Sequence, residues 1–334
     1  MTASTTRRDH GLRAGVPIGL LLTLAGCSPR ESSRQPTPAG ASGSAKSVSG
    51  VTVPVGSLDC PAALVAARRG GAQADRYVTP SETERGVLRG LVERLVRDGH
   101  RALAGARVDA EAVAYRLEEV PEVPGVVVLR EDPAKRRGGG AYLLRIGATS
   151  HLVVQAPHTF FDEGTLPLAC ELFRRSSAMA LFIDTAHRYK AAEVDDEGNY
   201  PADVAHSRES LFQAATEGLL RGRPDVTVVS LHGFSPRESG AAIVLSSGVA
   251  VRDQALQTRL KPRLQAVVPG SVQRFPDETS ELGGTTNVQG QAVRAAGGAF
   301  LHVEMSAPLR KALLADPELR ARVLGVLAEG AAPP

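Results

Sequence analysis

The chain has 334 residues, with 39 basic and 36 acidic side chains, so its formal net charge is only +3 with histidine neutral. This near balance argues against a nucleic-acid partner. The 4% aromatic content, without tryptophan, also leaves few side chains on which bases could stack. We expect a monomer that binds no nucleic acid.

The N-terminus is typical of an export signal. Three arginines lie within the first 13 residues, and a short apolar run, Ala14–Ala25, follows them. The run is too short for a permanent membrane span, so we interpret residues 1–26 as a removed signal peptide. Its end, Leu24-Ala25-Gly26-Cys27, resembles the bacterial lipoprotein processing box, which implies cleavage before Cys27 and lipidation of that residue. A plain signal peptide, in which Cys27 has no role, is the alternative.

Residues 27–50 are rich in Ser, Pro, Gly and Ala and have almost nothing to bury, which predicts a disordered tether. The remaining segment, 51–330, is long enough for a single α/β domain with a substantial core. The predicted location is therefore the cell envelope, where the lipid contacts the membrane and the domain faces the periplasm or the exterior.

Outside the cytoplasm, Cys60 and Cys170 could form a disulfide. Two separate buried thiols are the alternative.

The first half of the domain contains one helix signal and three strand candidates. Thr79-Pro80-Ser81-Glu82 predicts a helix start with Thr79 as the cap, and apolar residues then recur at helical spacing from Val87 to Val96. The strand candidates are 126–130, 142–146 and 152–155. We expect the first two to form a hairpin across the glycines at 138–140.

After residue 156 the pattern alternates between helices and strands. This alternation predicts an α/β fold: a mixed, mostly parallel twisted sheet of about eight strands with helices on both faces. The predicted helices are 165–179, 207–220, 252–260 and 287–296, with two more between 307 and 329. The predicted strands are 180–183, 226–231, 242–245, 264–268 and 299–303.

Chemically capable side chains follow several of these strands. His158, Asp184, His232 and Glu304 all lie at or just after predicted strand ends, and the carboxyl ends of parallel strands meet at one edge of a sheet. Glu163 follows His158 by five residues. Two histidines, a loop carboxylate and a separate glutamate are the parts of a hydrolytic zinc site, so we expect these residues to meet.

The alternatives within this hypothesis concern both carboxylates. Asp162 is a rival to Glu163 as the oxygen ligand, because either residue could face the ion if the loop curls back. A glutamate in the place of Glu304 could take a proton from water and pass it to a leaving amine. The alternative role of Glu304 is an ion pair with Arg310. His302 is the other candidate for the catalytic role, because it lies two residues before Glu304 and therefore on the same face of the strand.

Three short motifs resemble a known family. They are Ala156-Pro157-His158…Glu163, Leu231-His232-Gly233 and the run Val303–Arg310. Together they resemble the zinc carboxypeptidase-like superfamily, in particular its branch with poly-γ-glutamate hydrolases and N-formylglutamate amidohydrolases. The resemblance spans about 152–313. It implies one zinc ion held by His158, Glu163 and His232, with Glu304 as the catalytic base.

The resemblance also bears on the substrate. Ordinary zinc carboxypeptidases place the glutamate three residues after the first histidine, where this chain has Phe161, so the expected substrate is a γ-glutamyl or cell-envelope peptide, or an amino-acid amide. Relatives bind a substrate carboxylate with arginine, for which Arg188 is our first candidate and Arg310 the second. The expected activity is zinc-dependent amide hydrolysis. The alternative is an envelope lipoprotein that retains the fold and binds a ligand without turnover.

Overall fold

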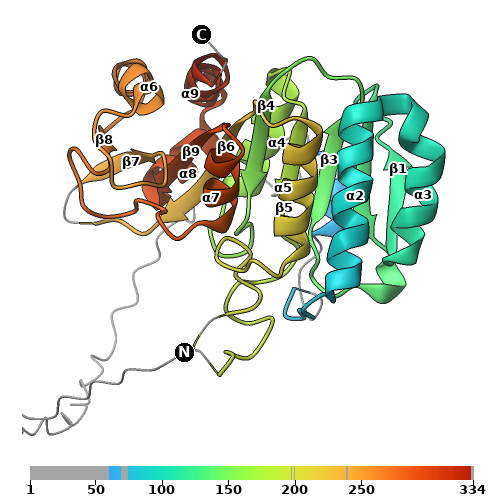
Figure 1. Cartoon of the computed structure of the whole chain (residues 1–334). Coiled ribbons are helices and arrows are strands. Elements are labelled where there is room, and N and C mark those ends of the chain that lie inside the picture. Colours follow the sequence, from blue (N-terminus) through green and yellow to red (C-terminus); the bar gives the residue numbers. More distant parts are fainter. Residues whose placement is uncertain (1–59, 69–73, 197, 199, 238–239, 332–334) are drawn as a thin grey trace, which may run out of the picture. The chain divides into compact units, whose positions relative to one another are not determined.

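A mixed sheet of nine strands organises the protein, in the order β1-β2-β3-β5-β4-β6-β9-β7-β8 (Figure 1). The computed structural model describes residues 60–68, 74–196, 198, 200–237 and 240–331. The predicted signal peptide, the predicted tether and Cys27 lie outside these residues. The strands are β1 Tyr115–Glu119, β2 Val126–Glu131, β3 Ala141–Arg145, β4 Leu152–Ala156, β5 Ala180–Ile183, β6 Thr227–Phe234, β7 Ala241–Ser246, β8 Ser271–Arg274 and β9 Ala299–Ser306.

Parallel pairing is concentrated in the middle of the sheet. Strands β5, β4, β6 and β9 run parallel to one another, whereas β1, β2 and β3 form an antiparallel meander that joins β5 in an antiparallel pair. On the other side β7 is antiparallel to β9 and parallel to β8. The predicted mixed α/β sheet is thus confirmed, although antiparallel pairs are as numerous as parallel ones.

Helices cover both faces of the sheet (Figure 1). Helices α2, α3, α5 and α7 pack into one apolar core, and α1, α4, α6, α8 and α9 pack into the other. Strand β4 is buried on both faces, since Val153 lies in the first core and Val154 in the second. The helices are α1 Ala62–Ala67, α2 Glu82–Asp98, α3 Leu103–Ala112, α4 Thr165–Arg175, α5 Leu211–Gly222, α6 Ala255–Gln265, α7 Val288–Ala295, α8 Ala307–Ala315 and α9 Pro317–Gly330, with 3-10 turns η1 Gly99–Ala102 and η2 Pro133–Lys135.

Two local predictions were wrong. The cap of α2 is Ser81, not Thr79: the Ser81 hydroxyl accepts from the Glu84 backbone N–H while the Glu84 carboxylate accepts from the Ser81 backbone N–H, which satisfies two donors at once. Residues 264–268 do not form a strand. Helix α6 continues to Gln265, because Leu260 and Leu264, four residues apart, both face the core.

A disulfide fixes the short first helix. Cys60, just before α1, is bonded to Cys170 on α4, and their Cα atoms are 5.2 Å apart. The bond ties the start of the described domain to the helix that follows the His158 loop. Within the part of the chain that the structure describes, no helix is long and apolar enough to cross a membrane.

Candidate metal centre

The register of β6 and β9 sets two pairs of polar side chains side by side. His232 pairs with Glu304, and Ser230 pairs with His302 two residues earlier. Side chains two residues apart on a strand share a face, so all four point the same way. His158 follows the end of β4, the other neighbour of β6, and therefore reaches the same edge of the sheet.

The loop after β4 is a tight turn that brings Asp162 back toward His158. The His158 carbonyl accepts from the backbone N–H groups of Phe161 at 3.0 Å and of Asp162 at 2.7 Å. Gly164, with a φ of 92°, then leads into α4. This left-handed conformation is one that glycine adopts without strain.

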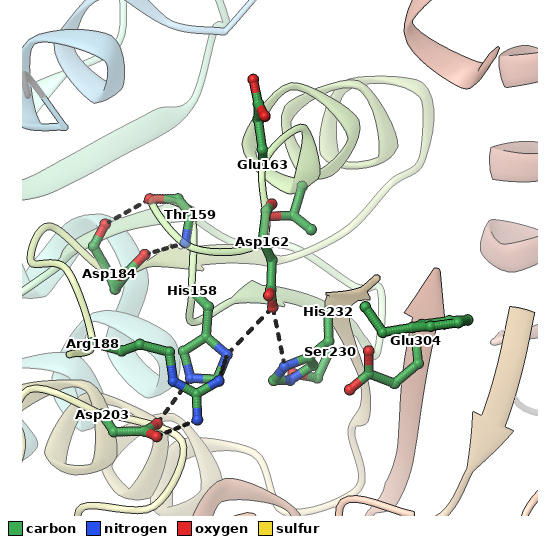
Figure 2. Close-up of polar contacts among 12 residues, drawn as sticks. His158, Thr159, Asp162, Glu163, Asp184, Arg188, Asp203, Ser230, His232 and Glu304 are labelled. Atoms are coloured by element: carbon green, nitrogen blue, oxygen red, sulfur yellow. Dashed lines mark hydrogen bonds and ion pairs between the residues drawn. The ribbon is translucent and has the colours of Figure 1, made fainter. Parts of the chain in front are cut away.

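Asp162 faces both histidines (Figure 2). Its Oδ2 lies 3.4 Å from His158 Nδ1 and 3.7 Å from His232 Nδ1, and one ligand atom from each residue lies within 4.8 Å of the others. Neighbouring ligands in a tetrahedral zinc shell, at bond lengths of about 2.1 Å, are about 3.4 Å apart. The three side chains, all buried, therefore fit a single zinc ion with little rearrangement.

Glu163 does not join this group. Its side chain is exposed and points away from His158 and His232, as Figure 2 shows. The reason is the helical geometry of the turn: residue i+4 lies on the same side as residue i, whereas residue i+5 is rotated away. The expectation that Glu163 is the oxygen ligand is thus corrected in favour of its neighbour Asp162.

Asp203 holds the other nitrogen of His158. Its Oδ1 lies 2.9 Å from His158 Nε2, and its Oδ2 pairs with Arg188 and lies 3.1 Å from His206 Nδ1. A carboxylate at Nε2 leaves Nδ1 free to face Asp162 and His232, an arrangement common among metal-binding histidines. The sequence gives no signal for this role of Asp203, since nothing in the spacing relates it to a histidine 45 residues earlier.

These contacts shift the ionisation of both groups. Burial disfavours the charged form of His158, but hydrogen bonds to Asp162 and Asp203 outweigh burial and raise the pKa of His158 to about 9. Burial alone would raise the pKa of Asp203, but His158, His206 and Arg188 lower it well below its usual range. In the absence of metal the pair is therefore an imidazolium facing a carboxylate.

His232 has the opposite environment. Burial, together with the nearby His302, His158 and Arg188, lowers its pKa well below the usual value for histidine. Its Nε2 lies 3.0 Å from the Ser230 hydroxyl, while Nδ1 faces Asp162. The low pKa keeps the ring neutral, which is the form in which histidine binds a metal.

Glu304 is buried beside these ligands. Its Oε1 lies 3.2 Å from His302 Nε2, and its Oε2 has no hydrogen-bond partner within the described residues. Those residues contain no ion pair between Glu304 and Arg310. The guanidinium of Arg310 donates instead to the backbone carbonyls of Glu163, Phe234 and Met305. Arg310 thus links the metal loop to β6 and β9, which assigns it a structural role in place of the expected substrate contact.

Arg188 and Asp184 also lie at this edge. Arg188 Nη1 is 3.2 Å from His158 Nδ1, and its guanidinium lies over the Tyr189 ring at 4.6 Å. Asp184 is not within the metal-binding group. It accepts from the Thr159 backbone N–H at 2.7 Å, and burial raises its pKa to about 7. A cavity of about 980 Å³, lined by residues that include Tyr189, Asp203 and His206, opens beside the centre.

Comparisons with known proteins give distant likenesses. No protein-family model and no curated protein matches the chain. An N-formylglutamate amidohydrolase of known structure from Ralstonia eutropha is 14% identical over 55% of this chain and 94% of its own, with a TM-score of 0.34. An aspartoacylase family protein from Mesorhizobium loti is 16% identical over 64% of this chain and 71% of its own, with a TM-score of 0.37. A metallo-carboxypeptidase from Burkholderia cenocepacia is 11% identical over 69% of this chain and 68% of its own, with a TM-score of 0.34.

Proposed function

We propose that the protein is a zinc-dependent hydrolase of amide bonds, with one ion held by His158, Asp162 and His232. The observation that carries the proposal is the convergence of these three buried side chains beside a buried carboxylate, Glu304, one oxygen of which has no partner among the described residues. Three protein ligands leave a position for water or substrate, as in catalytic zinc sites. A bound zinc ion would polarise the scissile carbonyl and lower the pKa of water.

The chain's own groups then divide the work. Asp203 orients His158 through Nε2, and Ser230 does the same for His232. Glu304 takes the proton of the attacking water on Oε2 and passes it to the leaving amine, a role for which a carboxylate beside the ion is suited. Arg188, held by Asp203 beside the cavity, is the group that would meet a substrate carboxylate, because its planar fork matches that anion.

The same residues support the family proposal. The motifs around His158, His232 and Glu304 resemble the zinc carboxypeptidase-like superfamily, and the structure brings these motifs to one edge of a mixed sheet. The proposed substrates are therefore carboxylate-bearing amides, such as γ-glutamyl peptides or peptides of the cell envelope. We further propose that lipidation of Cys27 anchors the domain to the membrane, on the support of the sequence motif alone.

Metal analysis of the purified protein tests the proposal. We expect near-stoichiometric zinc in the wild type, loss of zinc in His158→Ala and Asp162→Ala, and retention in the matched control Glu163→Gln. Retained zinc in Asp162→Ala with loss in Glu163→Gln would overturn our choice of oxygen ligand. Absence of zinc even after reconstitution would overturn the whole assignment.

The catalytic role needs a separate measurement. N-formyl-L-glutamate, poly-γ-glutamate and a hippuryl dipeptide are suitable probes, because they differ in the bond cut and in the position of the carboxylate. We expect Glu304→Gln to keep its zinc and lose about 10²- to 10⁴-fold in kcat. Normal turnover by this variant would rule out Glu304 as the base.

A further inference from the structure

His302 is a buried histidine that the proposed mechanism does not use. It lies on β9 two residues before Glu304, is only 3% exposed, and its ring centroid is 4.2 Å from that of the metal ligand His232. A buried imidazole is costly unless its nitrogens are used. Its position on the face of β9 that carries Glu304 therefore needs an explanation.

The contact with Glu304 makes the two oxygens of that carboxylate unequal. His302 Nε2 lies 3.2 Å from Oε1, whereas Oε2 is buried without a partner among the described residues. A carboxylate of glutamate rotates freely about its last torsion unless something holds one oxygen. A donor at Oε1 fixes that rotation and leaves Oε2 as the free acceptor.

The ring of His302 is itself held in place. Gly284 has a φ of 58° and lies so close that a Cβ on it would be 2.9 Å from His302 Cγ. That is closer than real Cβ contacts, so only glycine leaves room for the ring at this position. Gly284 and the His232 ring together restrict the movement of His302, which can then act as a fixed donor.

We propose that His302 is a positioning residue that holds Glu304 Oε1, so that Oε2 is the oxygen that receives the proton. This inference rests on the proposed role of Glu304 as the base. His232, His302 and Glu304 also have ligand atoms within 4.8 Å of one another, which could suit a second cation. The hydrogen bond between His302 Nε2 and Glu304 Oε1 accounts for the approach of the two side chains, while His302 Nδ1 and Glu304 Oε2 have no partner among the described residues.

A spectroscopic test does not depend on turnover. In the zinc-free protein, ¹⁵N NMR of the imidazole groups should show a proton on Nε2 of His302, and Glu304→Gln should shift that resonance. A His302 ring with a bare Nε2 would overturn the proposal.

A kinetic test uses His302→Leu, His302→Gln and the matched control His100→Leu, at an exposed histidine far along the chain. With the probe that the wild type hydrolyses, we expect His302→Leu to keep one zinc ion and its KM but lose roughly 10- to 100-fold in kcat. His302→Gln should recover part of that loss, because its amide nitrogen can donate to Oε1. His100→Leu should match the wild type.

The outcomes separate this inference from the proposed function. If Glu304→Gln is inactive while His302→Leu keeps full kcat, the positioning role is wrong and the base assignment stands. A wild type that binds two ions, one of them lost in His302→Leu, would identify a second metal position and also overturn the positioning role. If His302→Leu does not fold, the ¹⁵N spectra of the wild type and of Glu304→Gln still decide the proposal, because neither protein changes His302.

Discussion

The centre is built from two regions that hold their side chains in different ways. His232 and Glu304 lie within paired strands, where the register of β6 and β9 fixes them. His158 and Asp162 lie on a loop. The loop is held by its own turn, by Asp184, which accepts from the Thr159 backbone N–H, and by Asp203, which contacts the His158 ring. The strand region depends on the backbone pairing of β6 with β9, which the sheet contains whether or not the site is formed. The loop region depends on contacts from distant parts of the chain.

Arg68 is one such distant contact. It ends α1, donates to the Thr159 carbonyl at 2.7 Å and lies over the Phe160 ring at 4.4 Å. The Cys60–Cys170 disulfide fixes the other end of the same helix. Helix α1 thus holds the loop that carries His158 and Asp162. Because this loop depends on such distant contacts, we expect it to be disturbed more easily than the paired strands β6 and β9.

Removal of the disulfide should have the largest effect. Reduction, or the double change Cys60→Ser with Cys170→Ser, should lower the free energy of unfolding by about 2–4 kcal/mol, because the bond closes a loop of 110 residues. It should also speed zinc release from the loop region. Denaturant titration and zinc release to a chelator measure the two effects. Release at the wild-type rate would show that helix α1 does not support the loop.

Gly233→Ala tests the strand region. A Cβ at this position would lie 2.1 Å from Arg310 Nη1 and would push the guanidinium off the carbonyls that it binds. We expect a loss of about 1–3 kcal/mol in the free energy of unfolding, as for other overpacked sites. The control is Gly325→Ala in α9, where a Cβ meets nothing within 4 Å and should be neutral or stabilising. Equal stability of the two variants would contradict the close approach.

Asp203→Asn tests the support of the loop histidine. Loss of the charge at His158 Nε2 should weaken zinc binding about 10- to 100-fold, a range typical for groups that orient metal-binding histidines. Ser230→Ala removes the corresponding contact of His232 and should cost less, since the strand still holds the ring. Competition with a zinc-sensitive dye measures the zinc affinity of both variants. A larger loss of affinity in Ser230→Ala than in Asp203→Asn would show that the strand histidine, not the loop histidine, depends more on its supporting contact.

Asp184→Asn should change how stability depends on pH. The folded protein holds the Asp184 proton up to a pKa of about 7, whereas an unfolded aspartate releases it near pH 3.9. Between these values the folded state binds more protons, so the residue makes stability fall as pH rises, and above them its penalty is constant. The asparagine oxygen can still accept from Thr159, so the zinc-free variant should lose that slope. Identical slopes in denaturant titrations of the two proteins would refute the burial effect.

Much of the site could be predicted from the sequence because it lies near the carboxyl ends of strands, although β6 and β9 continue two residues past His232 and Glu304. Buried runs ending in His232 and Glu304 indicated strands, and parallel strands place their carboxyl ends together. The loop was predicted less well. A spacing of four or five residues from His158 suits either carboxylate until the conformation of the turn is known, and the turn selects Asp162.

The sequence by itself indicated strands β2 to β7 and β9, the edge of the sheet that carries the polar side chains, and that His158 and His232 lie there, because these follow from local hydrophobic patterning. It did not indicate β1 or β8. Only the tertiary structure decided between Asp162 and Glu163, brought Asp203 to His158, gave Arg310 its backbone carbonyls and set His302 against Glu304. Those contacts join residues far apart in the chain or depend on side-chain direction, and neither is encoded in a local pattern.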